Sequence, residues 1–125
     1  MTRPHFPLVA AAATALVLLA PCARTAFAHG EWAWIGDGRL TNPVTGKWCC
    51  GEDDCFVLDP GTVTEARTSY RVRLEGPEIP DRFRGRVVTV PRSWAQPTRD
   101  HHGRAWVCLD LTTGAPRCLF LYFGG

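Results

Sequence analysis

The sequence has no apolar run long enough to cross a bilayer, and it has few stretches that are free of helix breakers. Its longest apolar run, Leu8–Ala20, contains 13 residues, whereas a membrane-spanning helix needs about 20. The chain also contains ten prolines and twelve glycines, so long helices have little room after Ala28. We therefore expect neither a membrane-spanning helix nor a helical fold after residue 28.

The motifs of the common enzyme classes are absent as well. The sequence contains no Gly-x-Ser-x-Gly, no His-Glu-x-x-His and no phosphate-binding loop. The acidic run Glu52-Asp53-Asp54 lacks the alternating spacing of an EF-hand calcium loop. Because no nucleophile and base can be paired, the sequence favours a non-enzymatic protein and assigns no catalytic residue.

What the chain does have is the pattern of a cleavable export signal. A short basic start with Arg3 precedes the apolar run, and Ala26-Phe27-Ala28 supplies the small residues that a signal peptidase reads. We expect residues 1–28 to be a signal peptide and residues 29–125 to form a single mature domain. The predicted location is periplasmic or secreted, where cysteines are oxidised.

Apolar and polar residues alternate in several short segments of the mature domain. In residues 69–75, Tyr70, Val72 and Leu74 alternate with charged neighbours, which is typical of a half-buried strand. Residues 86–90 are β-branched, and residues 104–111 and 116–123 flank a turn at 112–115. We expect a mainly β fold, a small antiparallel sheet or a partly closed barrel of four to five short strands, stabilised by disulfides.

Charge is distributed unevenly along the mature domain. Residues 29–66 contain seven acids and two bases, whereas residues 67–104 contain nine arginines and four acids. We favour the interpretation that the two halves complement each other within the fold. The alternative is an arginine-rich face for an anionic partner.

Five cysteines remain after cleavage, and a domain this small usually needs cross-links. If the last hairpin turns about Thr113, Cys108 faces Cys118 within disulfide reach. This interpretation pairs Cys108 with Cys118 and Cys55 with Cys50 or Cys49, and it leaves one free thiol. The rival arrangement ties the Cys49-Cys50 pair to the C-terminal hairpin, which closes a longer loop.

The histidines provide an alternative function. Cleavage after Ala28 would leave His29 at the N-terminus, where its amine and imidazole can chelate copper, with His101 or His102 as a further ligand. Copper-dependent polysaccharide monooxygenases and periplasmic copper carriers use such an arrangement, and the resemblance here is limited to the Ala-His junction. The favoured interpretation has no cofactor, and a copper-handling protein is the alternative.

The cysteine pattern resembles that of a family of small exported alphaproteobacterial proteins of uncharacterised function. The matching segments are Cys49-Cys50-Gly51-Glu52-Asp53-Asp54-Cys55, Trp106-Val107-Cys108 and Arg117-Cys118-Leu119-Phe120. The resemblance implies a periplasmic or secreted location and brings no known activity.

These patterns together predict a non-enzymatic exported module that binds a protein or an envelope component, and not nucleic acid. The mature domain has five tryptophans, which is many for its size. Most of them are expected in the core. A surface cluster that binds sugar or peptide is the alternative.

Overall fold

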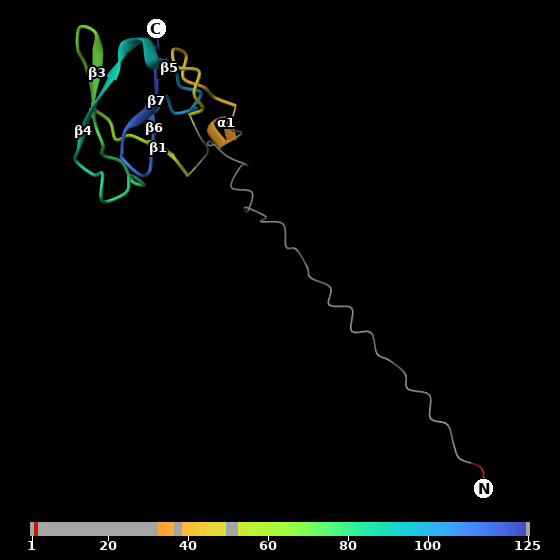
Figure 1. Ribbon diagram of the computed structural model, residues 1–125. Helices are drawn as coiled ribbons and strands as arrows, with labels where there is room; N and C mark the ends of the chain where they lie inside the picture. The colour runs from red at the N-terminus through yellow and green to blue at the C-terminus, as the bar shows by residue number, and fades with distance from the viewer. Residues whose placement is uncertain (1, 3–32, 37–38, 50–52, 125) are drawn as a thin grey trace.

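The computed structural model describes residues 2, 33–36, 39–49 and 53–124 (Figure 1). The expected signal peptide (1–28), His29 and Cys50 lie outside the described residues. None of the helices in the described part is long and apolar enough to cross a membrane. The elements, in chain order, are α1 (Ala33–Gly36), β1 (Cys55–Val57), β2 (Val63–Glu65), β3 (Ser69–Arg73), β4 (Val87–Pro91), the 3-10 helix η1 (Arg92–Trp94), β5 (Ala95–Pro97), β6 (Trp106–Leu109) and β7 (Pro116–Leu121).

The strands form two small sheets, which confirms the expected mainly β fold. One sheet has four strands in the order β1-β6-β7-β5, and the other has three in the order β2-β3-β4. The strand count is higher than expected because β2 and β5 have only three residues each, too few for alternation to show in the sequence. β5 also pairs parallel to β7, while the other pairs are antiparallel.

The four-stranded sheet is buried on both faces. From β6, Val107 and Leu109 pack against the three-stranded sheet, in a core shared with Val72 and Val90. The opposite face of β6 carries Trp106, which packs in a second core beneath the N-terminal segment. Each fully buried side chain of this size contributes about 1.5–3 kcal/mol, so the N-terminal segment is an integral layer of the fold.

Aromatic edges hold that segment in place. Trp34 of α1 meets the rings of Trp106 and Phe120 edge-on, with centroid separations of 5.8 and 5.1 Å. Edge-to-face pairs add about 0.5–1.5 kcal/mol beyond the area that they bury. The expectation that most tryptophans pack in the core therefore holds for Trp34 and Trp106.

Two disulfides link Cys49 to Cys118 and Cys55 to Cys108. The predicted Cys108–Cys118 bridge and the predicted bridge from Cys55 to Cys50 or Cys49 are both wrong. Cys108 and Cys118 do face each other across β6 and β7, as predicted, but an irregularity after Cys108 places Leu109 opposite Pro116. The rival arrangement is closer to the structure, because both bridges tie the acidic N-terminal loop to the final hairpin. Whether Cys50 is the free thiol lies outside the described residues.

Hydrogen-bonded and non-hydrogen-bonded positions alternate along β6, and this alternation explains why Cys108 is bridged to Cys55 and not to Cys118. Leu58 donates its N–H to the Ala105 carbonyl (2.9 Å), and Leu109 donates to the Asp54 carbonyl (2.8 Å). Cys108 lies between these positions and therefore forms a non-hydrogen-bonded pair with Cys55 of β1. Opposite residues approach most closely in such pairs, and the Cα atoms of Cys55 and Cys108 are 3.9 Å apart. A residue directs its N–H and C=O to the same side, so the bonds of Cys108 run to β7. The facing pair with β7 is thus the wider, hydrogen-bonded kind.

Candidate functional site: a tryptophan-lined groove

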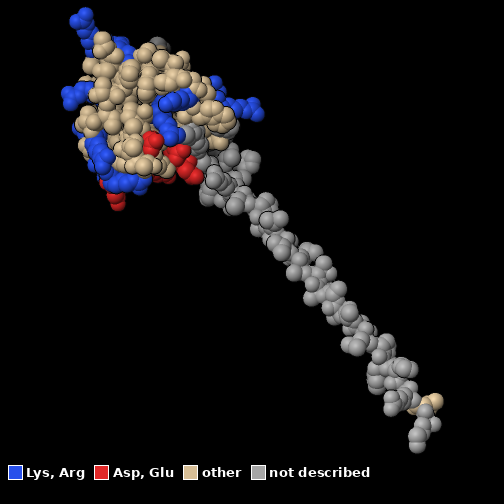
Figure 2. Space-filling view, viewed as in Figure 1, with Lys and Arg blue, Asp and Glu red and all other residues tan. Residues whose placement is uncertain are grey.

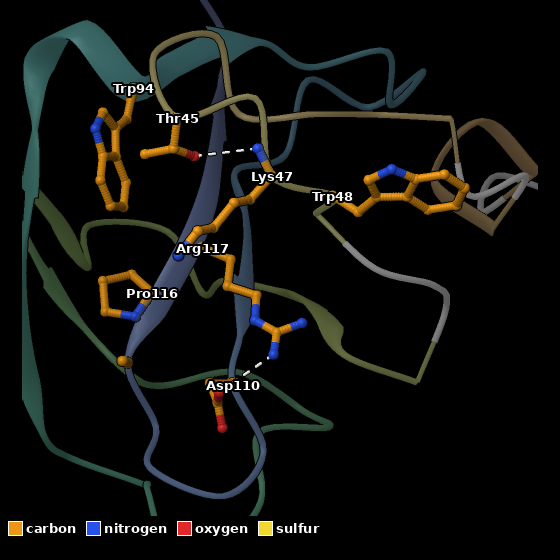
Figure 3. A pocket seen from close by; sticks show the side chains of 8 residues that line it. Thr45, Lys47, Trp48, Trp94, Asp110, Pro116 and Arg117 are labelled. Carbon is orange, nitrogen blue, oxygen red and sulfur yellow. Dashed lines mark hydrogen bonds and ion pairs between the residues drawn. The ribbon is translucent and has the colours of Figure 1, made fainter.

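A groove of about 440 Å³ lies where the N-terminal segment meets the start of β7 (Figure 3). Its volume falls in the range of small-molecule and oligomer binding sites. The lining residues come from three parts of the chain and are Thr45, Lys47, Trp48, Trp94, Asp110, Ala115, Pro116 and Arg117.

Asn42 builds the N-terminal wall of the groove. Its side chain is buried, and its Oδ1 accepts hydrogen bonds from the backbone N–H groups of Val44 (2.9 Å) and Thr45 (3.0 Å). Its Nδ2 donates to the Arg117 carbonyl at 2.8 Å. A single amide therefore shapes the tight turn and docks it on β7, which is the reason for burying a polar side chain here.

Two further ties hold the same wall. The Cys49–Cys118 disulfide joins it covalently to β7, and Gln96 of β5 donates from Nε2 to the Thr41 carbonyl at 2.9 Å. The wall is thus attached at three points to neighbouring strands. Such attachment keeps Lys47 and Trp48 in place without burying them.

The opposite wall is made by η1 and the tip of the β6–β7 hairpin. Trp94 of η1 is half-buried against the core between the two sheets. At the hairpin, Asp110 Oδ1 accepts from the N–H groups of Thr112 (2.8 Å) and Thr113 (3.2 Å), and Oδ2 accepts from Arg117 Nη2 (3.1 Å). The hydrogen bond from Thr112, together with those from Arg117 and Thr113, lowers the pKa of the Asp110 carboxyl below its usual value. Asp110 is therefore ionised at neutral pH and orients the Arg117 guanidinium.

The groove presents aromatic surface on either side of positive charge. Trp48 and Trp94 lie at its two ends, and the Lys47 side chain extends between them towards Pro116 (Figure 3). Trp48 is 66% exposed. Arg117 is paired with Asp110, but Lys47 forms no ion pair with any of the described residues. An anionic group bound here would meet an ammonium that is not ion-paired with any described residue, while the Asp110 carboxylate in the same groove is paired with Arg117.

The predicted metal ligands lie elsewhere. His101 and His102 are both exposed, in the turn between β5 and β6, and His29 is outside the described residues. No group of three or more candidate metal ligands occurs in the part of the chain that the structure describes. The copper site therefore stays a prediction.

Asp100, which precedes these histidines, has a structural role. Its Oδ1 accepts from the His102 N–H (2.8 Å), and its Oδ2 accepts from Trp106 Nε1 (2.8 Å) and Arg104 Nε (2.7 Å). Burial raises the pKa of this carboxyl, but the hydrogen bonds from Trp106, Arg104 and His102 outweigh it, so the pKa lies below its usual value. Both oxygens hold the fold together and are not directed at a ligand.

The sequence could not have indicated the groove as a unit. The tryptophans were recognisable, but nothing in the sequence connected them with Lys47 or Arg117, because Asn42 and Arg117 lie 75 positions apart and meet only in the fold. Comparisons with protein-family models, curated proteins and solved structures find no match to this chain. The function is therefore inferred from the groove itself.

Proposed function

We propose that this protein is an exported, disulfide-stabilised binding module that holds an anionic polymer of the cell envelope in the tryptophan-lined groove. The observation that carries the proposal is the position of Lys47 between the Trp48 and Trp94 ends of the groove. The module is non-enzymatic and binds its ligand without changing it.

The arrangement suits a polymer in which sugar rings alternate with carboxylates. The exposed indole ring of Trp48 and the accessible part of the half-buried Trp94 ring offer flat apolar surfaces on which the C–H faces of a sugar can stack. The ammonium of Lys47 attracts a carboxylate, while the Asp110–Arg117 pair offers acceptors and donors for hydroxyl groups.

An extracytoplasmic location agrees with the covalent structure. Two disulfides cross-link a small domain, and such bridges persist in oxidising compartments. The expected signal peptide supplies the route of export. The groove is then exposed to the same compartment as the envelope polymers.

Binding to soluble peptidoglycan fragments, which carry sugar rings beside carboxylates, tests the proposal. Isothermal titration calorimetry should give a measurable Kd for the unmodified protein. Trp48→Ala should weaken binding by about fivefold or more, because truncating a tryptophan at the centre of a binding site costs more than about 1 kcal/mol. Lys47→Gln should weaken binding and reduce its dependence on salt.

Phe123→Ala is the matched control, since Phe123 is also an exposed aromatic residue (55%) but does not line the groove. This variant should bind as the unmodified protein does. Equal affinity of the Trp48→Ala and Phe123→Ala variants would overturn the assignment of the groove. A ligand that proves to be a protein, with no affinity for the glycan fragments, would replace the polymer in the proposal.

A further inference from the structure

The arginines of the basic half gather on the three-stranded sheet and the loop that follows β3. Residues 67–92 contain seven arginines and three acids. In Figure 2 the blue side chains border the side of the molecule that carries β3 and β4, and red atoms gather near the start of β1. The molecule therefore has a basic side, although its mature chain is formally neutral.

Pairing between the two halves of the sequence removes little of this charge. Arg92 forms an ion pair with Glu65 of the acidic half. Arg73 and Arg84 instead pair with acids of their own half, Glu75 (3.0 Å) and Asp81 (3.3 Å). The expectation that the halves complement each other holds for Arg92–Glu65 and not for these two pairs.

The outward face of β3 carries Arg71 and Arg73, while Tyr70 and Val72 point into the core. Residues directly opposite in neighbouring strands share a face and lie about 5 Å apart. Arg71 is opposite Thr64 on β2 and Thr89 on β4, so a threonine lies on each side of Arg71 on the same face.

A shallow hollow of about 220 Å³ runs along this row. It is lined by Gly61, Thr62, Thr64, Arg71, Arg73 and Val87. Val87, opposite Arg73 on β4, is 51% exposed. The face thus combines the positive charge of Arg71 with the ion-paired Arg73 and an exposed apolar side chain opposite Arg73. Arg71 forms no ion pair with the residues that the structure describes.

We propose that this outer face of the β2-β3-β4 sheet docks on an anionic phospholipid bilayer. Arg71 binds lipid phosphates through its guanidinium fork, which matches phosphate geometry, and Arg73, whose charge is offset by Glu75, contributes further N–H donors. Thr64 and Thr89 donate hydroxyl hydrogen bonds to the remaining phosphate oxygens, and Val87 enters the headgroup layer.

A bilayer fits this face better than a small anion does. The exposed positions extend along two strands rather than converging on one point, and binding to a membrane surface gains from both attraction to anionic lipids and buried apolar area. The tryptophan-lined groove shares no residue with the hollow. A protein docked through this sheet could therefore still hold a ligand in the groove.

Co-sedimentation with lipid vesicles tests the proposal. The protein should bind vesicles of phosphatidylglycerol mixed with phosphatidylcholine, and should not bind vesicles of phosphatidylcholine alone. A basic residue near an anionic membrane is worth about a fivefold change in partitioning. Arg71→Gln should therefore weaken binding by about fivefold, and added salt should weaken it further.

Arg99→Gln is the matched control, because it removes the same charge from an exposed residue outside the sheet. Val87→Asp, a surface change, should weaken binding more than Arg99→Gln does. Unchanged melting temperatures will show that each variant is folded. Equal binding of the Arg71→Gln and Arg99→Gln variants, or equal binding to charged and uncharged vesicles, would overturn the proposal.

Discussion

The two disulfides are nested, and this predicts that their contributions to stability are not additive. Cys49–Cys118 spans 69 residues and encloses Cys55–Cys108, which spans 53. When the inner bridge is already formed, closing the outer bridge makes a ring of only 16 residues, which is the difference between the two separations. In the chain-entropy treatment a ring of this size contributes about 3 kcal/mol, whereas either long loop in an otherwise open chain contributes about 4 kcal/mol.

Replacing either pair of bridged cysteines by alanine should therefore lower the free energy of unfolding by about 3 kcal/mol. Replacing both pairs should lower it by about 7 kcal/mol, which exceeds the sum of the two single losses. Urea unfolding followed by tryptophan fluorescence would measure the free energy of unfolding of the unmodified protein and the three variants. Added sucrose at several concentrations would keep the least stable variant folded at the start of the titration.

Loss of the sulfur atoms also leaves small cavities, because all four cysteines are fully buried. Reducing the unmodified protein keeps these atoms, so the difference between the reduced protein and the alanine variants isolates the packing contribution. A combined loss equal to or smaller than the sum of the single losses would refute the nested-ring reasoning.

Two further predictions concern single positions. Gly76→Ala would place a Cβ in collision with the Val57 carbonyl oxygen, so the backbone must shift. The free energy of unfolding measured in urea should fall by about 2 kcal/mol, and a neutral effect would contradict this close approach. The pKa of Asp100 is lower in the folded protein than in the unfolded chain. As the pH falls, the unfolded chain therefore takes up this proton before the folded protein does. The stability from this carboxylate is present above its unfolded pKa, about 3.9, and is lost as the pH falls through the lower folded value. Asp100→Asn should make the melting temperature depend less steeply on pH in that acidic range. An unchanged pH dependence would show that Asp100 does not cause the loss of stability in acid.

Features of the fold that depend on residues close together in the sequence could be predicted from the sequence. The alternation in residues 69–75 gives one buried and one solvent face, and β3 has that pattern. The turn chemistry of the last hairpin likewise placed Cys108 opposite Cys118. Both features depend on residues that are near one another in the sequence.

What could not be predicted depends on distant partners. The partner of Cys108 is set by the phase of its hydrogen bonds, and this phase is fixed only when β1, some 53 residues earlier, pairs with β6. The burial of β6 on both faces requires the N-terminal layer, which carries no strand alternation. The groove depends on Asn42 reaching Arg117 across 75 positions.

The outer disulfide, Cys49–Cys118, is flanked in sequence by residues of the groove. Trp48 immediately precedes Cys49, and Arg117 immediately precedes Cys118. The two walls of the groove are therefore joined by the same covalent bond that oxidation creates. A chain in which this bridge is reduced keeps the Asn42 and Gln96 hydrogen bonds of the wall but lacks its covalent tie, so the groove is held less firmly before oxidation. Under the proposed function, formation of the Cys49–Cys118 bridge would therefore precede tight binding of the ligand.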